Sequence, residues 1–327
     1  MSGYNWRMSV AARIRPLDLF TREEWEKLSA RNDWMGPLLV LHAWAVIAGA
    51  MALDMWQPLL IPIAIMVIGA RQLGLTILMH DAAHGALHSN PKVNHFLGHW
   101  LSGAPMGGHL INYRNYHLQH HKYAQQPEDP DLILSAPFPI TKTSLRRKII
   151  RDLTGQTFFK QRRNQFANAL GIGIKPRKGN ANRAQSAREA VIPMLITNAV
   201  IFAVLALLGY WWAYFVLWLL PMATWMQMIT RLRNIAEHAV VPDNEDPMRH
   251  ARTTLANPIE SFLIAPYWVN YHCEHHMFMH VPCYRLGAAH KALTRKGITD
   301  RMEVQHGYLT VLKKAASKPS PAMVPAE

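Results

Sequence analysis

The chain contains four apolar runs that are long enough to cross a lipid bilayer, and this feature limits its fold more than any other. The first two runs cover residues 37–53 and 58–79, and a short turn separates them. A second pair covers residues 191–209 and 211–229 and includes Pro221, which is expected to kink the last helix. An apolar helix of roughly 20 residues spans the ~30 Å hydrocarbon core of a membrane. The pattern therefore predicts an all-α integral membrane protein with four transmembrane helices in two hairpins.

Positive charge is concentrated in the segment that joins the two expected hairpins. The chain has a formal net charge of +14, and the part between Lys142 and Arg188 holds 13 basic residues and one acidic residue, Asp152. Loops rich in Lys and Arg lie on the cytoplasmic side of membrane proteins. Few aromatic side chains in this part are available for stacking on bases, so we expect it to set membrane orientation and not to bind nucleic acid. Both termini and the basic loop are therefore expected on the cytoplasmic side.

Three parts are expected along the chain. Residues 1–36 form a cytoplasmic or interfacial segment, whose helix begins at a capping box in residues 21–24. Residues 37–310 form the membrane domain. Within it, the apolar stretch 95–106 is too short to span and is expected to be half inserted or buried in a cytoplasmic helical cap. Residues 311–327 are expected to be a disordered tail.

The 18 histidines are far more than a chain of this length usually contains, and three groups of them repeat at helical spacing. The sequence HDAAH at 80–84 places two imidazoles at i and i+4. The sequences HLQHH at 117–121 and HCEHH at 272–276 each place three at i, i+3 and i+4, on one side of a helix. Each group follows or precedes an expected hairpin on the same side of the membrane. The eight imidazoles are those of His80, His84, His117, His120, His121, His272, His275 and His276.

Eight neutral imidazoles exceed the ligand set of a single zinc ion, which takes four ligands in structural sites and about three in catalytic ones. Two metal ions are implied. Imidazole binds iron, copper, nickel and zinc, so the ligands alone leave the metal open. The membrane setting argues for a buried lipid substrate. Iron is favoured because attack on an unactivated C–H bond of such a substrate would need a redox metal. A proton relay, a pH sensor or a zinc-transport path would place ionisable side chains inside the spans, where only His42 and Arg71 lie.

With these three motifs around two hairpins, the chain resembles the membrane fatty acid desaturases and the related lipid hydroxylases and carotenoid oxygenases. The resemblance covers roughly residues 38–293. It implies a four-helix transmembrane stalk beneath a cytoplasmic helical cap, and two iron ions, bound by the eight histidines, that use dioxygen as co-substrate. The family's Asn-x-x-x-His motif after the fourth span implies that His238 is a ninth ligand and that Asn234 acts through water. Glu237, inside that motif, is expected either to bind metal itself or to accept a hydrogen bond from a histidine that does.

Two carboxylates lie beside ligand positions. Asp81 and Glu274 are expected to accept the other ring N–H of a liganding imidazole and so to fix its orientation; the alternative is that both are solvated side chains on a helix face. The substrate channel is expected to run from the metals toward the bilayer between aromatic and methionine side chains. The residues expected to line it are Trp100, Met106, Tyr113, Trp268 and Phe278.

The expected function is dioxygen-dependent oxidation of C–H bonds in a lipid, with desaturation of a fatty acyl chain as the first hypothesis. One alternative is a carotenoid or lipid hydroxylase or ketolase with the same di-iron chemistry, since the Glu128-Asp129-Pro130-Asp131 run is shared with carotenoid ketolases and hydroxylases. Another is a membrane zinc carrier or sensor without catalysis. The chain has no His-Pro-Gly-Gly haem motif. Electrons are therefore expected from a separate donor, such as a ferredoxin or cytochrome b5 with its reductase.

Overall fold

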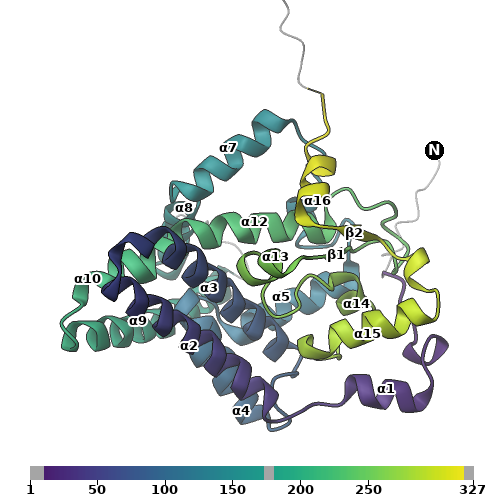
Figure 1. Cartoon of the computed structure of the whole chain (residues 1–327), viewed down its shortest axis with the longest axis horizontal. Helices are drawn as coiled ribbons and strands as arrows, with labels where there is room; N and C mark the ends of the chain where they lie inside the picture. The colour runs from purple at the N-terminus through teal and green to yellow at the C-terminus, as the bar shows by residue number, and fades with distance from the viewer. Residues whose placement is uncertain (1–10, 173–179, 320–327) are drawn as a thin grey trace, which may run out of the picture.

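Helices make up most of the computed structural model, which describes residues 11–172 and 180–319 (Figure 1). Four helical stretches are long and apolar enough to cross a membrane, which confirms the number expected from the sequence. These stretches are Met35–Trp56, Pro58–Ala83, Gln185–Leu207 and Trp211–His238. The first three correspond to α2 (Met35–Trp56), α3 (Ile61–Ala83, preceded by the 3-10 turn η2, Pro58–Leu60) and most of α9 (Asn180–Leu207).

The second and fourth stretches continue beyond the ends expected from hydropathy. Helix α3 continues to Ala83, where His84 caps it and Gly85, at φ 72°, turns the chain. The fourth stretch ends with α12 (Trp225–His238). Hydropathy falls in these last turns because they carry polar side chains, but no Gly or Pro interrupts them and the helices continue. The added turns bring His80, His84 and His238 out of the apolar part of each helix.

The fourth stretch is irregular before α12 begins. It consists of α10 (Trp211–Ala213), a π-helical turn η5 (Tyr214–Leu219) and α11 (Leu220–Ala223), and its backbone leaves helical geometry at Thr224. This interruption follows Pro221, whose ring is incompatible with a regular preceding turn. The indole of Trp218 donates a hydrogen bond of 2.9 Å to Asn198 of α9, so the irregular part is held to its neighbour by a partly buried polar contact.

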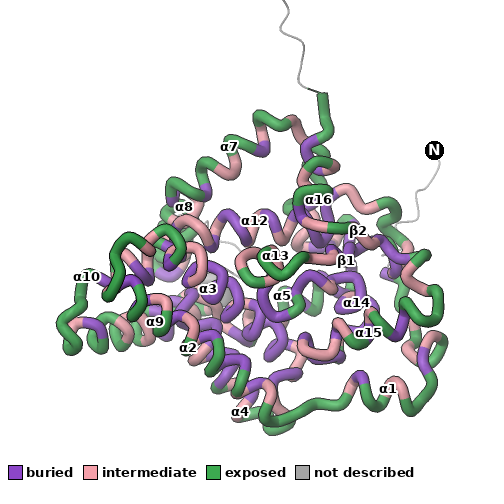
Figure 2. Tube along the Cα trace, in the orientation of Figure 1, coloured by how far each residue is buried: buried purple, intermediate pink, exposed green. Residues whose placement is uncertain are grey.

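Apolar side chains remain exposed on the outer helices. Figure 2 shows green, exposed turns along α9 and α10, whereas α3 and the centre of the molecule are purple. The exposed side chains of α9 include Leu195, Val200 and Leu207. In water such a face would be unfavourable, but in a bilayer it lies against lipid tails. The exposure pattern therefore agrees with the assignment of α9 as a membrane span.

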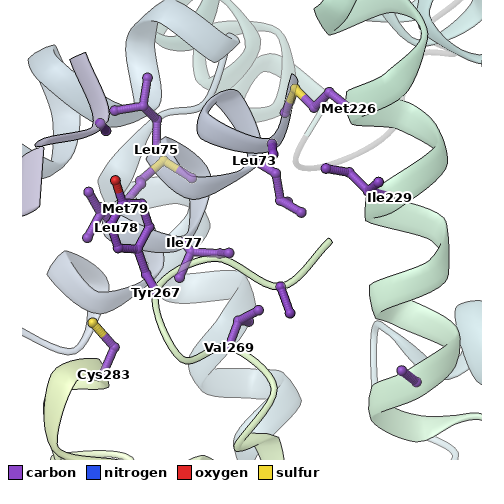
Figure 3. Close-up of a cluster of buried hydrophobic side chains, with 14 of the residues drawn as sticks. Leu73, Leu75, Ile77, Leu78, Met79, Met226, Ile229, Tyr267, Val269 and Cys283 are labelled. Atoms are coloured by element: carbon purple, nitrogen blue, oxygen red, sulfur yellow. The ribbon is translucent and has the colours of Figure 1, made fainter. Parts of the chain in front are cut away.

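The buried core fixes α3 beside α12. In Figure 3 the side chain of Leu73 on α3 lies near those of Met226 and Ile229 on α12, with Ile77 of α3 and Val269, from the segment between α13 and α14, below them. Because the two helices pack along each other, their histidine-bearing ends face the same region.

The remaining helices surround those two ends. Helix α5 (Leu110–Tyr123) packs against α3, and α14 (His272–Met277) packs against α15 (Cys283–Arg295). The stretch expected to be half inserted or buried forms a π-helical segment, η3 (Phe96–Gly103), which packs on α3 and is largely buried. The other helical elements are η1 (Pro16–Asp18), α1 (Arg22–Ser29), α4 (Pro91–His95), η4 (Ala104–Met106), α6 (Leu132–Ser135), α7 (Lys142–Leu153), α8 (Gln156–Ala169), α13 (Pro258–Leu263), η6 (Thr299–Arg301) and α16 (Tyr308–Ala315).

Two features of the C-terminal part correct the sequence analysis. A short parallel sheet joins β1 (Thr253–Leu255) to β2 (Val304–His306), so the chain is not wholly α-helical. The segment from residue 311 was expected to be disordered, but it contains the end of α16, whose Val311 is buried in the core. Hydrophobic contacts and a backbone hydrogen bond from Ile140 to Ala315 hold this helix in place. Residues 320–327 of the expected tail lie outside the described residues.

The N-terminus of α2 makes a close contact that only glycine allows. A Cβ atom built on Gly36 would lie 1.9 Å from the carbonyl oxygen of Leu87. We therefore expect Gly36→Ala to lower the melting temperature of the purified protein, measured by tryptophan fluorescence, because overpacking of this kind costs about 1–3 kcal/mol.

The matched control is Gly49→Ala on the same helix, where an added Cβ meets nothing within 4 Å. Alanine is a better helix former than glycine by about 1 kcal/mol, so this variant should melt at the same or a higher temperature. An equal loss of stability in both variants would contradict the close contact at Gly36.

Candidate metal centre

Five histidines from three helical segments form the first of two clusters. His80 is on the last turn of α3 and His84 caps that helix, while His117 and His121 are one turn apart on α5. His275 on α14 completes the group. Each of the five residues offers one ring nitrogen, and these five nitrogen atoms all lie within 4.8 Å of one another.

Four further histidines form the second cluster. His120 comes from α5, His238 from the end of α12, and His272 and His276 from successive turns of α14. The structure therefore brings together all nine histidines that the sequence analysis assigned to metal binding, five in one group and four in the other.

Helices α5 and α14 each contribute to both clusters. On α5, His117 and His121 face the first cluster and His120 the second, and α14 divides its histidines in the same way. The rings of His121 and His276, which belong to different clusters, have centroids 4.4 Å apart. The two clusters are therefore neighbours and form one centre with two ligand groups.

Burial keeps these imidazoles in the form that can bind metal. Removal from water, and then the neighbouring histidines, lower the pKa of His117, His121, His275 and His276 well below its usual value. At neutral pH the rings are uncharged, so each has a nitrogen lone pair available. A neutral imidazole is the form that acts as a ligand.

The distances between these nitrogens fit a shared cation better than hydrogen bonding alone. The Nε2 atom of His121 lies 2.9 Å from that of His117 and 3.0 Å from that of His275. One proton on each ring cannot satisfy such a three-way contact, whereas ligand atoms about 2.0–2.1 Å from one ion lie about 3 Å apart when they are adjacent. Nε2 of His80 and both ring nitrogens of His84 are buried and have no hydrogen-bond partner. The residues present therefore fit two metal ions.

The second cluster has the same spacing. Nε2 of His272 lies 2.9 Å from Nε2 of His238 and 3.1 Å from Nε2 of His276. The fourth member, His120, has its Nε2 atom 3.2 Å from that of His276. No carboxylate belongs to either group in the described part of the chain, so both ligand sets consist of imidazoles alone.

Neighbouring acceptors orient several of these rings. Nδ1 of His120 lies 2.8 Å from a carboxylate oxygen of buried Asp129, and Nδ1 of His238 donates to the carbonyl oxygen of His250 at 3.0 Å. Glu237 is not in a cluster, but its carboxylate lies 3.4 Å from Nδ1 of His272. An acceptor on one ring nitrogen fixes the tautomer and directs the other nitrogen toward a metal.

Comparison with known proteins agrees with this geometry. Residues 54–305 match the family described as fatty acid desaturase. The chain belongs to the fatty acid desaturase family.

Its relatives include enzymes with different substrates. The chain is 26% identical over 289 residues to the dihydrorhizobitoxine desaturase of Bradyrhizobium elkanii, covering 83% of this chain and 79% of that protein. It is also 26% identical over 263 residues to the beta-carotene ketolase of Paracoccus sp. (strain PC1), covering 77% and 87%. The chloroplastic omega-3 fatty acid desaturase of Glycine max is 22% identical over 276 residues, covering 77% of this chain and 58% of that enzyme.

Two carboxylates of this desaturase family member have partners other than those expected. Asp81 accepts a hydrogen bond from the backbone N–H of Cys283 at 3.1 Å. Glu274 is bonded to the hydroxyl of Thr253 and lies 2.6 Å from Nδ1 of His290. Neither contacts a ring of the clusters, which corrects the expectation that they orient ligands. On α14, Glu274 contacts Thr253 of β1 and His290 of α15, while its neighbouring histidines belong to the two clusters.

The sequence analysis did not assign a role to Asp129, although it noted the acidic run in which this residue lies. That run follows the second histidine motif directly, so the signal was a carboxylate in a turn just after a ligand helix. His250 was also left out; its ring is buried with no hydrogen-bond partner, 5.4 Å from that of His276. It lies near the motifs in the sequence, but spare histidines close to a site are more often found behind the ligands or at the surface, so it was not assigned to metal binding.

A hollow of about 170 Å³ lies beside the second cluster. Most of the residues that line it carry a polar group: Arg233 pairs with Glu237, and the hydroxyl of Tyr116 donates to Asp131. Asn234 also lines the hollow, and its side chain makes no hydrogen bond within the described residues. The hollow therefore offers polar groups next to the ligand histidines.

The five residues expected to form one channel do not line a common cavity. Tyr113 lines the hollow beside the second cluster, whereas Trp268 and Phe278 line two other cavities. Met106 is buried, and Trp100 packs its ring against His99. A single channel through all five residues therefore stays a prediction. Aromatic and methionine side chains near the motifs mostly fill the core, as such residues usually do.

We expect Asp129→Asn to weaken metal binding about 10–100-fold, the usual effect of removing a residue that orients a ligand. Besides His120, Asp129 accepts the backbone N–H groups of Gln125 and Asp131; the amide of Asn cannot replace all three contacts or the charge. The measurement is metal content by mass spectrometry during titration with a chelator. Asp300→Asn, at an exposed position, is the control. If both variants lose metal at the same chelator concentration as the wild type, Asp129 does not orient a ligand.

Proposed function

We propose that this chain is a membrane di-iron oxidoreductase that uses dioxygen to desaturate a fatty acyl chain of a membrane lipid. The observation that supports the proposal most strongly is the pair of adjacent all-imidazole clusters, which would hold two ions close together. Membership of the fatty acid desaturase family supports the reaction class.

Iron is the metal that suits this reaction. Imidazole binds several metals, but removal of hydrogen from an unactivated methylene requires a redox-active ion. When bound, two irons would supply dioxygen activation and the transfer of electrons. The nine ligands would be His80, His84, His117, His120, His121, His238, His272, His275 and His276.

The chain's own residues have three tasks in this proposal. The surrounding core excludes water from the rings and keeps them neutral. Asp129, Glu237 and the carbonyl of His250 orient individual imidazoles. Asn234, whose amide is free to bind a water molecule or a polar group of the substrate, lies in the wall of the hollow where we infer that the reacting part of the substrate lies.

Hydroxylation or ketolation of a carotenoid is the second candidate. It is favoured by the 26% identity to a beta-carotene ketolase over most of both chains. The same ligands serve either outcome, because removal of a second hydrogen gives an alkene whereas transfer of oxygen to carbon gives an alcohol. A zinc carrier or sensor without catalysis is the remaining alternative.

The proposal also includes an orientation. The four spans would form two hairpins, and the metal centre, the basic helices α7 and α8 and both termini would lie on the cytoplasmic side. Electrons would come from a separate donor protein on that side, such as a ferredoxin or cytochrome b5 with its reductase.

The test combines metal content with lipid products. We expect purified wild-type protein to contain two irons per chain, and lipids from an expressing host to contain acyl chains with two hydrogens fewer. His120→Ala should abolish this product, because it removes a ligand of the second cluster, while the protein remains in the membrane. His306→Ala removes an exposed histidine outside both clusters and should retain activity.

Three results would contradict the proposal in different ways. Oxygen added to a pigment, with unchanged acyl chains, would favour the carotenoid alternative. Zinc alone, with no oxygen consumption, would exclude an oxygen-dependent enzyme. Full activity of His120→Ala would exclude its role as a ligand.

A further inference from the structure

Arg71 is a buried cation inside a candidate membrane span. It lies near the middle of α3, and only 3% of its surface is exposed. Its Nη2 donates to the carbonyl oxygen of Phe262, and its Nε has no hydrogen-bond partner. Among the described residues, no carboxylate forms an ion pair with it. Ionisable residues within spans are rare because they are costly, and they usually serve a function.

A second buried arginine, Arg252, shows what a structural role would require. Arg252, 1% exposed, pairs with Glu303 at 3.0 Å and donates to the carbonyl oxygens of Ala236, Ala239 and Val240. Its charge is therefore compensated within the protein. Arg71 has aromatic rings in place of a carboxylate, with the guanidinium carbon 4.8 Å from the ring centre of Phe262 and 5.4 Å from that of Tyr267. Such contacts compensate a buried charge only in part.

Arg71 lies in the wall of a cavity of about 650 Å³. His42 and Tyr267 share this wall, and Nδ1 of His42 lies 3.0 Å from the hydroxyl of Tyr267. The lining contains no Asp or Glu. The cavity therefore has one fixed positive charge, several neutral polar side chains in its lining, and no carboxylate.

The backbone near this cavity is held in a strained conformation. Tyr267 and Trp268 are consecutive non-glycine residues with φ of 55° and 57°, a region that bulky side chains rarely adopt. The ring of Tyr267 lies against α3 (Figure 3). This contact requires glycine at position 74, because a Cβ atom on Gly74 would lie 2.5 Å from the tyrosine ring. Strain of this kind persists where the surroundings enforce it, often at binding sites.

The rim of the cavity is apolar and exposed. Leu38 on α2, Phe262 on α13 and Trp268 are 55%, 44% and 38% exposed. In a membrane this rim would contact lipid tails, so a molecule with an anionic group and an apolar chain would match both the wall and the rim.

We propose that this cavity binds an anionic membrane lipid, with a carboxylate or phosphate oxygen of the lipid as the counter-ion of Arg71. A guanidinium binds either oxyanion through its planar set of N–H donors. The site is separate from the metal centre. His80 is nine residues farther along α3, which places it about 14 Å away along the axis and on the opposite side of the helix.

The test measures retained lipid by native mass spectrometry of purified protein incubated with oleate, phosphatidylglycerol or phosphatidylcholine. Wild-type protein should retain one copy of an anionic lipid and little phosphatidylcholine. Arg71→Gln should reduce that retention at least tenfold, and Arg71→Lys, which keeps the charge without the planar donors, should reduce it less. Arg146→Gln removes an exposed arginine on α7 and is the matched control.

Each outcome decides the proposal. Preference for oleate identifies a carboxylate ligand, and preference for phosphatidylglycerol identifies a phosphate; both support the site. Added anionic lipid should also raise the melting temperature of the wild type but not of Arg71→Gln. If Arg71→Gln does not accumulate, Tyr267→Phe, which lacks the hydroxyl beside His42, should show weaker retention. Equal retention of all three lipids, or unchanged retention in the variants, would overturn the proposal. Metal content reports separately on the catalytic centre.

Discussion

The burial of nine imidazoles with their nitrogens directed at one another is the constraint on which the rest of the structure depends. A buried polar group without a partner costs about 1–3 kcal/mol, and Nε2 of His80 and both nitrogens of His84 are in that state. Metal ions would replace this cost by favourable bonds, so metal binding and the packing of this region are coupled. Packing of the core around the site and binding of metal therefore stabilise each other.

The helices meet this requirement through their lengths and spacing. Helices α3 and α12 continue past their apolar parts, and their last residues carry His80, His84 and His238 to one region. Helix α5 then uses the 100° step between successive residues to direct His120 to one cluster and His121 to the other. One short helix thus fixes the separation of the two ligand groups, and α14 repeats the arrangement from the opposite side of the centre.

The predictable parts of this protein are those set by local spacing. Four apolar runs and three histidine motifs lie within short windows, so their helices and the faces of their histidines follow from periodicity. Partners brought from distant parts of the chain did not follow. Glu274 meets Thr253 and His290, and β1 pairs with a strand about 50 residues later. The tail was misjudged for the same reason, because burial of Val311 depends on packing of α16 against α12.

The two faces of α3 illustrate how a membrane span can hold polar groups for different reasons. At its end, His80 is surrounded by other imidazoles, and a cation can join them because the lone pairs converge. In its middle, Arg71 is surrounded by aromatic rings and a carbonyl group, and the anionic lipid group proposed above would complete its contacts. The two ligands would have opposite charge, and the helix between them is mainly apolar and buried. Whether an ionisable residue within a span would bind a cation or an anion therefore has to be inferred from the charge of its neighbours.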